Sequence, residues 1–337
     1  MRPAATFLPR FRLCRSAALV ATGALLISFA AAGCEGEVTG AIPDGPRGAS
    51  DGPVPSIDAP GDSDDAAVPA DATPGDRAGP GIKPTADNTG VPAGVDLMVI
   101  DHDVVLDEDG AMLDAVDVHG TVTIAANQVR VTRSIIRGRE LSGNGAALRI
   151  DSGEDIVVED VQILPSVPTV FLDSVWASGA TLRRMDIQGG VDGIKAGSST
   201  TIEYSYIHDM TSFDSDPNQG GGATHNDAIQ ILSGSVLRIT GNNLVVTTDQ
   251  NAAIQVTQDF GEVSDLVIAQ NWADGGGCTF NFSHNGGDSL AVTTRDNRFG
   301  RGSFYDCPIL KSTKTTLDSS GDVFDDTGEP VPVQTHD

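Results

Sequence analysis

Residues 208–230 (HDMTSFDSDPNQGGGATHNDAIQ) concentrate side chains that can transfer protons, donate hydrogen bonds or coordinate a cation. The stretch interrupts a regular spacing of short β-rich segments, since 37 residues separate Ile207 from Leu244. Long excursions from a regular repeat often carry binding residues. The chain then returns to a strand with Gln230, and we expect neighbouring strands to present Lys195 and Gln255 on either side. The candidate side chains in the stretch are His208, Asp209, Asp214, Asp216, Asn218, Gln219, His225, Asn226 and Asp227.

One chemistry that these groups could support is β-elimination of a uronic acid, which needs a base near the C5 proton and a cation or hydrogen-bond donors at the carboxylate. Lys195 and His225 are the candidates for the base, and His208 belongs to the same acid–base set. An ordinary solvated lysine and a structural histidine are the alternatives for the first two. The side chains expected to bind the substrate are Gln230, Gln255, Asn281 and Asn218.

A second chemistry is hydrolysis by paired carboxylates, for which Asp192, Asp209 and Asp227 are the candidates. Asp192 and Asp227 occupy equivalent places before their strands (VDGIK and NDAIQ). Both could therefore be structural residues that hydrogen-bond to the backbone of a turn.

A third possibility is a calcium site, because hard cations take oxygen ligands. Asp209, Asp214 and Asp216 are the candidate ligands, with Asp227 and backbone carbonyls nearby. The stretch has no fixed-spacing calcium motif, and two histidines without a third close ligand argue against zinc. No other cofactor is indicated.

Two series of apolar residues indicate the elements that must position these groups. The first recurs every 20 to 37 residues after a short β-rich run, and a unit this short must stack on its neighbours to bury its apolar face. Its members are Ile136, Ile163, Ile187, Ile207, Leu244, Trp272, Phe299 and Phe324.

The second series is a set of similar strands: GIKAG, AIQIL, AIQVT, TFNFS and PILKS. A period of two predicts that Ile194, Ile229, Ile254, Phe280 and Ile309 point inward. Lys195, Gln230, Gln255 and Asn281 then point outward. Short strands, Gly/Asn-rich turns and no helical periodicity beyond the N-terminal segment predict an all-β, single-stranded parallel β-helix of about eight or more coils.

The segments NTGVPAG, DGIKAG and THNDAIQI resemble those of secreted bacterial proteins of the right-handed parallel β-helix, pectate-lyase-like superfamily, over about residues 88–330. The resemblance implies the fold and its right-handedness. It does not carry a catalytic set, because the WIDH and RxPxxR motifs of calcium-dependent pectate lyases, the polygalacturonase series and the DPHD motif of mannuronan epimerases are missing. The first functional hypothesis is a lyase acting on a uronate-containing polysaccharide, and the alternative is a non-catalytic glycan-binding or structural surface module.

Residues 1–90 lack the repeated β-rich segments of the rest of the chain. Basic residues precede an apolar run, residues 17–32, and the sequence AAAGC ends at Cys34, as in a bacterial lipoprotein signal with cleavage after residue 33. The alternative is an ordinary secretory signal with an incidental cysteine. Residues 34–90 are rich in Pro, Gly, Ala and Asp, which predicts a disordered acidic tether. We therefore expect an exported protein held on a membrane through a lipid at Cys34, with one folded domain at 91–337.

Composition and cysteine positions limit the partners. With 47 acidic against 21 basic residues and a net charge of −26, the chain lacks the basic surface that nucleic acid requires. A monomer that binds a polysaccharide is expected. Cys278 lies two residues before Phe280 and Cys307 two before Ile309, so the two cysteines occupy matching positions on consecutive coils and are predicted to form a disulfide.

Overall fold

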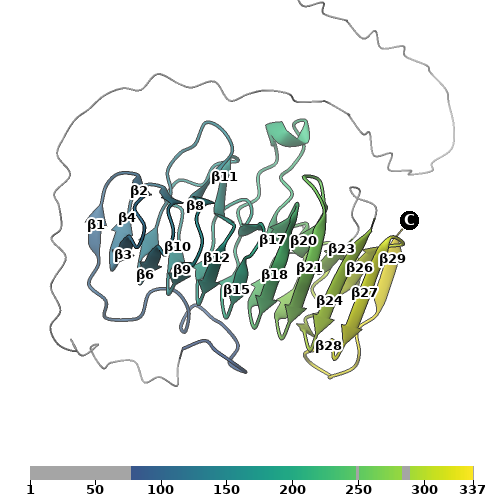
Figure 1. Ribbon diagram of the computed structural model, residues 1–337. Coiled ribbons are helices and arrows are strands. Elements are labelled where there is room, and N and C mark those ends of the chain that lie inside the picture. Colours follow the sequence, from purple (N-terminus) through teal and green to yellow (C-terminus); the bar gives the residue numbers. More distant parts are fainter. Residues whose placement is uncertain (1–76, 248–249, 283–288, 337) are drawn as a thin grey trace, which may run out of the picture. The chain divides into compact units, whose positions relative to one another are not determined.

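The chain folds as a right-handed parallel β-helix, in which each coil contributes strands to three long parallel sheets (Figure 1). The computed structural model describes residues 77–247, 250–282 and 289–336. Two of the sheets contain ten strands and the third contains nine, and every neighbouring pair of strands is parallel. The fold class and the coil number expected from the sequence are therefore confirmed.

The strands of each sheet follow one another from coil to coil. The first sheet is made of β1 (Met98–Ile100), β4 (Val116–Val118), β7 (Ile135–Ile136), β10 (Gln162–Ile163), β13 (Asp186–Ile187), β16 (Tyr206–Ile207), β19 (Asn243–Val245), β22 (Trp272–Asp274), β25 (Arg298–Phe299) and β28 (Val323–Phe324). The second sheet is made of β2 (Val104–Leu106), β5 (Val122–Ala125), β8 (Gly145–Ser152), β11 (Leu172–Ala177), β14 (Ile194–Ala196), β17 (Asp227–Ile231), β20 (Ala252–Val256), β23 (Phe280–Phe282), β26 (Ile309–Ser312) and β29 (Val333–His336). The third sheet is made of β3 (Met112–Asp114), β6 (Arg130–Thr132), β9 (Ile156–Glu159), β12 (Ala180–Arg183), β15 (Thr201–Glu203), β18 (Gly234–Thr240), β21 (Val263–Ala269), β24 (Leu290–Arg295) and β27 (Thr315–Ser320).

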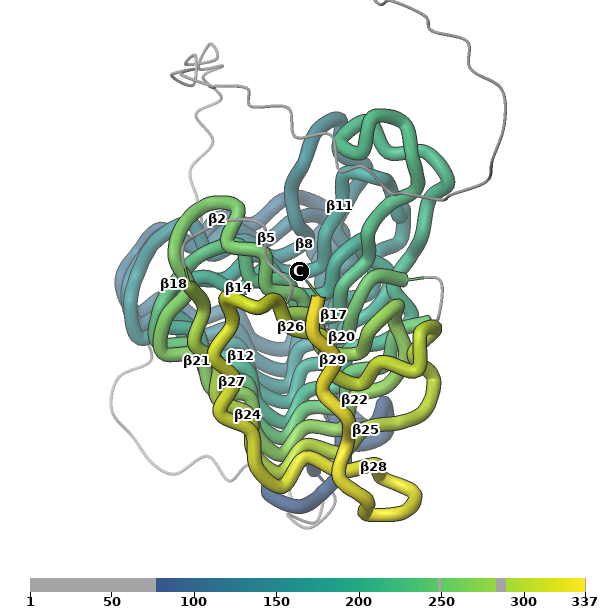
Figure 2. The backbone as a smooth tube through the Cα atoms, turned by 90° about the vertical axis from the view of Figure 1, so that its right-hand side faces the viewer, coloured from purple at the N-terminus to yellow at the C-terminus, as the bar shows by residue number. Residues whose placement is uncertain are grey.

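The view along the axis shows the coils superimposed, with loops projecting beside the second sheet (Figure 2). One of these loops contains the single helical turn of the described chain, the 3₁₀ helix η1 (Pro217–Gln219). Within the described ranges, no helix is both long enough and apolar enough to span a membrane.

The inward columns form one continuous apolar core. In the second sheet, Ile194, Ile229, Ile254, Phe280 and Ile309 are paired in one register and fully buried, as the period of two predicts.

The first sheet corrects one member of the series read from the sequence. Leu244 pairs with Ala273, which pairs with Phe299, whereas Trp272 pairs with Asn243 and Arg298 in the outward column. The spacing of the series indicated Trp272 as the equivalent inward residue, whereas the register assigns that position to Ala273. A shift of one residue in a strand moves a side chain to the other face of the sheet.

A column of buried amides supports the corner between the third and first sheets, where Asn242, Asn271 and Asn297 are fully buried. The Oδ1 atoms of Asn271 and Asn297 each accept hydrogen bonds from the backbone N–H and the Nδ2 of the equivalent asparagine one coil earlier. Each asparagine also donates from Nδ2 to a carbonyl of the coil before it, as Asn271 does to Ile239 at 2.9 Å. Asp322 ends the column by accepting from Asn297. These side chains satisfy backbone groups that the turn leaves without partners.

The folded part begins earlier than the boundary at residue 91 that the sequence suggested. Residues 77–90 lie across several coils as a strap, which is how we refer to this segment below. Asn243 donates to the carbonyl of Pro84 at 2.9 Å, and the N–H of Gly90 donates to the carbonyl of Arg184 at 2.8 Å. Arg77 forms an ion pair with Asp160. The predicted signal at 1–33, Cys34 and the tether up to residue 76 lie outside the described residues and stay predictions.

The amide column predicts a large and local stability effect. Replacing Asn271 with alanine should leave the N–H of Asn242 and the carbonyl of Ile239 buried without partners, at a cost of about 1–3 kcal/mol for each group. Urea denaturation monitored by circular dichroism measures this change. Asn127→Ala is the matched control, because Asn127 is exposed and water can replace its hydrogen bonds, so an equal loss in both variants would contradict the role of the column.

Candidate functional site

The outer face of the second sheet carries a groove, the central part of which is a cavity of about 540 Å³. Its floor is the outward column of strands β14, β17, β20 and β23, where Lys195, Gln230, Gln255 and Asn281 lie in register. The structure therefore brings together the four outward residues named from the sequence, and all of them line the cavity.

The excursion at 208–230 forms one wall of this groove. Asn218, in η1, exchanges two hydrogen bonds with Asn144, which lies in the loop before β8. Asn226 is fully buried at the base of the excursion and donates to the carbonyls of Val191 and Thr211 at 2.7 and 2.8 Å. The wall is thus joined to the coil before it and also to a loop further back along the axis, and Figure 2 shows these loops projecting together.

Beneath the groove lies a column of three carboxylates: Asp173, Asp192 and Asp227. They lie on three consecutive coils, and each comes two residues before one of the paired inward residues Val175, Ile194 and Ile229. Parallel strands are about 4.8 Å apart, so the backbones of the three aspartates are stacked at about that spacing. The first two accept a hydrogen bond from the backbone of the next coil: Asp173 from the N–H of Asp192 at 3.1 Å, and Asp192 from the N–H of Asp227 at 2.8 Å. The structural role that the sequence analysis kept open for Asp192 and Asp227 is therefore present.

Lys195 is held by two members of this column. Its Nζ lies 2.6 Å from Oδ2 of Asp173 and 3.0 Å from Oδ2 of Asp192, and the two carboxylates are only 7% and 4% exposed. Burial lowers the pKa of Lys195, but the charges of the two aspartates outweigh it and raise the pKa above its usual value. A lysine that stays protonated at neutral pH cannot act as a general base, so the structure argues against that role for Lys195.

Asp192 and Asp227 have carboxyl groups that are harder to ionise than usual. Burial and the nearby charge of Asp173 raise the pKa of Asp192 to about 7, with Lys195 offsetting part of the effect. Burial and the charge of Asp192 also raise the pKa of Asp227 well above its ordinary value, although Asn251 and Gln230 donate to its carboxylate. Asp227 is fully buried, which keeps it from direct contact with a ligand in this conformation.

Aromatic side chains stand at both ends of the groove, and the sequence analysis missed them. A cavity of about 340 Å³ shares Lys195 and Gln230 with the central one and is lined by Trp176 and Phe260. Another of about 430 Å³ shares His225 and Asn251 with the central one and is lined by Phe304 and Tyr305. The three cavities therefore form one groove across the sheet.

Trp176 is fixed in the outward column between two cations. The guanidinium carbon of Arg149 lies 5.6 Å from the indole centroid and the ammonium of Lys195 lies 5.8 Å from it. Its Nε1 donates to Asp173 at 2.6 Å. The register gives a signal that could have revealed this residue, because Trp176 pairs with Lys195 in the same outward column.

The two candidate histidines are placed differently. His225 is exposed and lines the groove between the central cavity and the aromatic one formed by Phe304 and Tyr305. His208 lies at the first sheet instead, where its ring nitrogens contact Asp186 at 2.8 Å and Asp209 at 2.6 Å and its ring stacks on Tyr206. Although burial lowers the pKa of His208, these hydrogen bonds raise it above its usual value. His208 is a structural residue outside the groove, and its catalytic assignment is corrected.

The three proposed calcium ligands do not converge. Asp209 contacts His208, Asp214 is exposed, and Asp216 accepts from the N–H of Asn218 as the N-cap of η1. In the described part of the chain, no three acidic, histidine or cysteine side chains are grouped as they would have to be to hold a metal ion. The residues present therefore do not fit a calcium site. Of the hydrolase candidates, Asp209 contacts His208 at the first sheet, whereas Asp192 and Asp227 are buried in the carboxylate column.

The predicted disulfide between Cys278 and Cys307 is present, with Cα atoms 4.7 Å apart. The cysteines occupy the same register position as the three aspartates, further along the axis, with Ala252 between the two groups. The covalent link thus continues the column at the end of the groove where Tyr305 lies.

Comparisons with known proteins identify no family. No protein-family model matches the sequence, and no curated protein shows significant similarity to it. One solved structure with a detectable likeness is that of a trypsin-treated variant of QnrB1, a plasmid-mediated fluoroquinolone resistance protein. The likeness covers 68% of this chain and 92% of that one, at 10% sequence identity and a TM-score of 0.23.

The carboxylate column predicts that stability depends on pH. Because folding raises the pKa of Asp192 from 3.8 to about 7, its stabilising contribution is complete below pH 3.8 and is lost as the pH rises through 7. We expect the free energy of unfolding to fall by at least about 1 kcal/mol between about pH 5 and about pH 8. Urea denaturation at a series of pH values tests this, and Asp192→Asn should reduce the slope. An unchanged slope in that variant, matching the control Asp318→Asn, would contradict the assignment.

Proposed function

We propose that the groove on the second sheet binds a segment of a polysaccharide. The observation that carries the proposal is that Phe260, Phe304 and Tyr305, the three largely exposed aromatic side chains of the described chain, all line this groove. Exposed aromatic rings scattered over the surface would be consistent with chance, but here they stand at opposite ends of one polar depression. An apolar ring face can stack on a sugar ring, while the polar groups between them fix its orientation.

The centre of the groove supports the same proposal. Its floor presents the carboxamides of Gln230 and Asn281, and Asn251 adds another from the edge. Carboxamides both donate and accept hydrogen bonds, as sugar hydroxyls do. Because the three cavities are continuous through shared residues, the groove suits several linked sugar units better than a single one. Export and lipid anchoring at Cys34 remain part of the proposal, since a protein at the outer side of a membrane meets polysaccharides there.

The exposed aromatic residues provide the direct test. Phe260→Ala and Tyr305→Ala should each weaken polysaccharide binding by about fivefold to tenfold, because each removes a stacking surface worth about 1 kcal/mol. Affinity gel electrophoresis or isothermal titration calorimetry against a panel of soluble polysaccharides measures the loss. Both side chains are mostly exposed, so the unfolding midpoint should not change.

A suitable control is Met112→Ala, which removes a side chain of similar exposure on the third sheet near the N-terminal end of the solenoid. It should bind like the unmodified protein. Equal affinity of all variants would show that the groove is not the binding site.

A second candidate is cleavage of a uronate-containing chain by β-elimination, which one observation favours: His225 and the cation of Lys195 line the same cavity. The imidazole of His225 would take the C5 proton, a double bond would form between C4 and C5, and the C4–O bond would break with the proton going to the leaving oxygen. Lys195, Gln230 and Gln255 would face the uronate carboxylate. Lys195 then serves as a hydrogen-bond donor to the substrate, in place of the base first considered for it.

This candidate predicts that the protein produces an absorbance near the band of unsaturated uronates when it is mixed with acidic polysaccharides. His225→Ala should lower the rate by about a hundredfold or more, and His225→Gln should not restore it. The fold should survive both substitutions, since His225 is exposed and has no structural hydrogen bond among the described residues, so binding can be measured on the same variants. The absence of any absorbance change on a panel of uronate polysaccharides would remove the candidate and leave the binding function.

A further inference from the structure

We infer that the polysaccharide taken by this groove is electrically neutral, not a polyanion. The inference rests on the proposed glycan-binding function and adds the class of glycan to it. If it holds, the β-elimination candidate fails, because elimination requires a uronate.

Acidic groups outnumber basic ones around the central cavity. Among the described residues that line it, four carry carboxyl groups, of which Asp192 has a raised pKa, and one, Lys195, carries a permanent positive charge. The four lining carboxyl groups are those of Asp173, Asp192, Asp216 and Asp259.

The positive charge of Lys195 is already matched by neighbouring carboxylates. Its ammonium contacts Asp173 and Asp192 at 2.6 and 3.0 Å, and these two hydrogen bonds use two of its three N–H groups. Lys195 can therefore give a ligand one more hydrogen bond, but it has no excess positive charge to offer an anion. A sugar hydroxyl needs only the hydrogen bond.

Two of the acidic groups have no cationic partner among the described residues. Asp259 is exposed at the rim, and Asp216 is bound by the backbone N–H of Asn218 at 2.8 Å. A sugar carboxylate or sulfate within about 4 Å of such a group in a partly sheltered groove would be repelled strongly enough to weaken binding roughly tenfold or more. The net charge of −26 adds a longer-range repulsion that salt would screen.

The test compares binding of the full chain to neutral and anionic glycans of similar length. The neutral set contains oligosaccharides of glucose, xylose and mannose, and the anionic set contains oligogalacturonate, oligoalginate and hyaluronan fragments. At low ionic strength we expect at least one neutral glycan to bind and every anionic glycan to bind at least tenfold more weakly. An anionic glycan that binds as tightly as the best neutral one overturns the inference and leaves the binding function standing. Failure of every glycan to bind overturns the proposed function and, with it, the inference.

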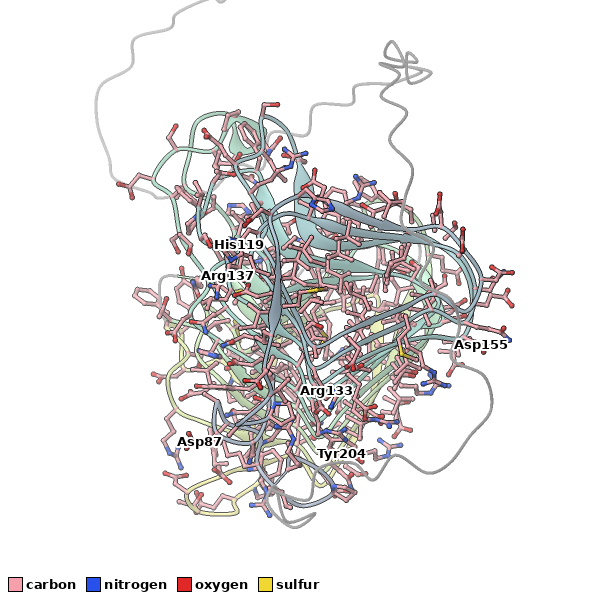
Figure 3. All side chains as sticks on the ribbon, turned by 90° about the vertical axis from the view of Figure 1, so that its left-hand side faces the viewer. Asp87, His119, Arg133, Arg137, Asp155 and Tyr204 are labelled. Carbon is pink, nitrogen blue, oxygen red and sulfur yellow. A yellow bond between two sulfur atoms is a disulfide. The ribbon has the colours of Figure 1, made fainter. Side chains whose placement is uncertain are left out.

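A pair of matched variants tests whether electrostatic repulsion is what weakens the binding of anionic glycans. Asp259→Asn removes one charge from the rim without touching the buried column, and it should strengthen binding of anionic glycans by about threefold to tenfold at low salt relative to neutral glycans measured on the same variant. Asp87→Asn makes the same charge change on the strap, away from the second sheet, and should alter neither (Figure 3). Unchanged anionic binding in Asp259→Asn, or an equal effect of both variants, would contradict the electrostatic explanation.

Discussion

The structure depends on the parallel pairing that repeats from coil to coil, because this pairing places equivalent positions of consecutive coils directly over one another. Whatever residue occupies a position meets the residue of the next coil at the same position, about 4.8 Å away. For Ile194, Ile229 and Ile254 the arrangement buries apolar surface against apolar surface. For Asn242, Asn271 and Asn297 it joins a donor to an acceptor in every step, because a carboxamide carries both.

The same pairing is unfavourable for carboxylates, because it stacks like charges. The polar groups beneath the groove are arranged to reduce this repulsion. Asp173, Asp192 and Asp227 would repel one another if all were ionised and unpaired. The chain places Lys195 against the first two, and backbone N–H groups donate along the column. The raised pKa values of Asp192 and Asp227 reflect burial together with the part of the repulsion that remains. Lys195 is thereby committed to structure, which explains why its outward position alone does not make it a catalytic base.

The sequence was sufficient to predict which way a side chain points wherever the strands follow a period of two. It predicted the inward column of the second sheet, the outward row of Lys195, Gln230 and Gln255, and the phase that joins Cys278 to Cys307. It was wrong about Trp272, where two adjacent apolar residues fit the pattern and only the register separates them.

The positions of the loop side chains could not be predicted from the sequence, because loops have no period that fixes where a side chain points. Residues close in sequence were therefore assigned to one site, although His208 lies at the first sheet and His225 in the groove. Phe304 and Tyr305 were missed for the same reason, since they reach the groove from the turn between β25 and β26, far along the chain from the excursion. The resemblance to β-helix enzymes supplied the architecture and no catalytic residue.

The strap (residues 77–90) links the N-terminal end of the solenoid directly to coils in its middle, which stacked repeats alone do not do. In a one-dimensional array each coil contacts only its neighbours, so the terminal coil can open without disturbing the middle. Here the chain reaches the coil of β19 through Asn243, returns through Gly90 to the neighbourhood of Arg184, and only then enters β1. Fraying of the first coil is thus tied to contacts halfway along the axis, and a pulling force applied to the N-terminal side is transmitted to the middle of the protein before it reaches the end.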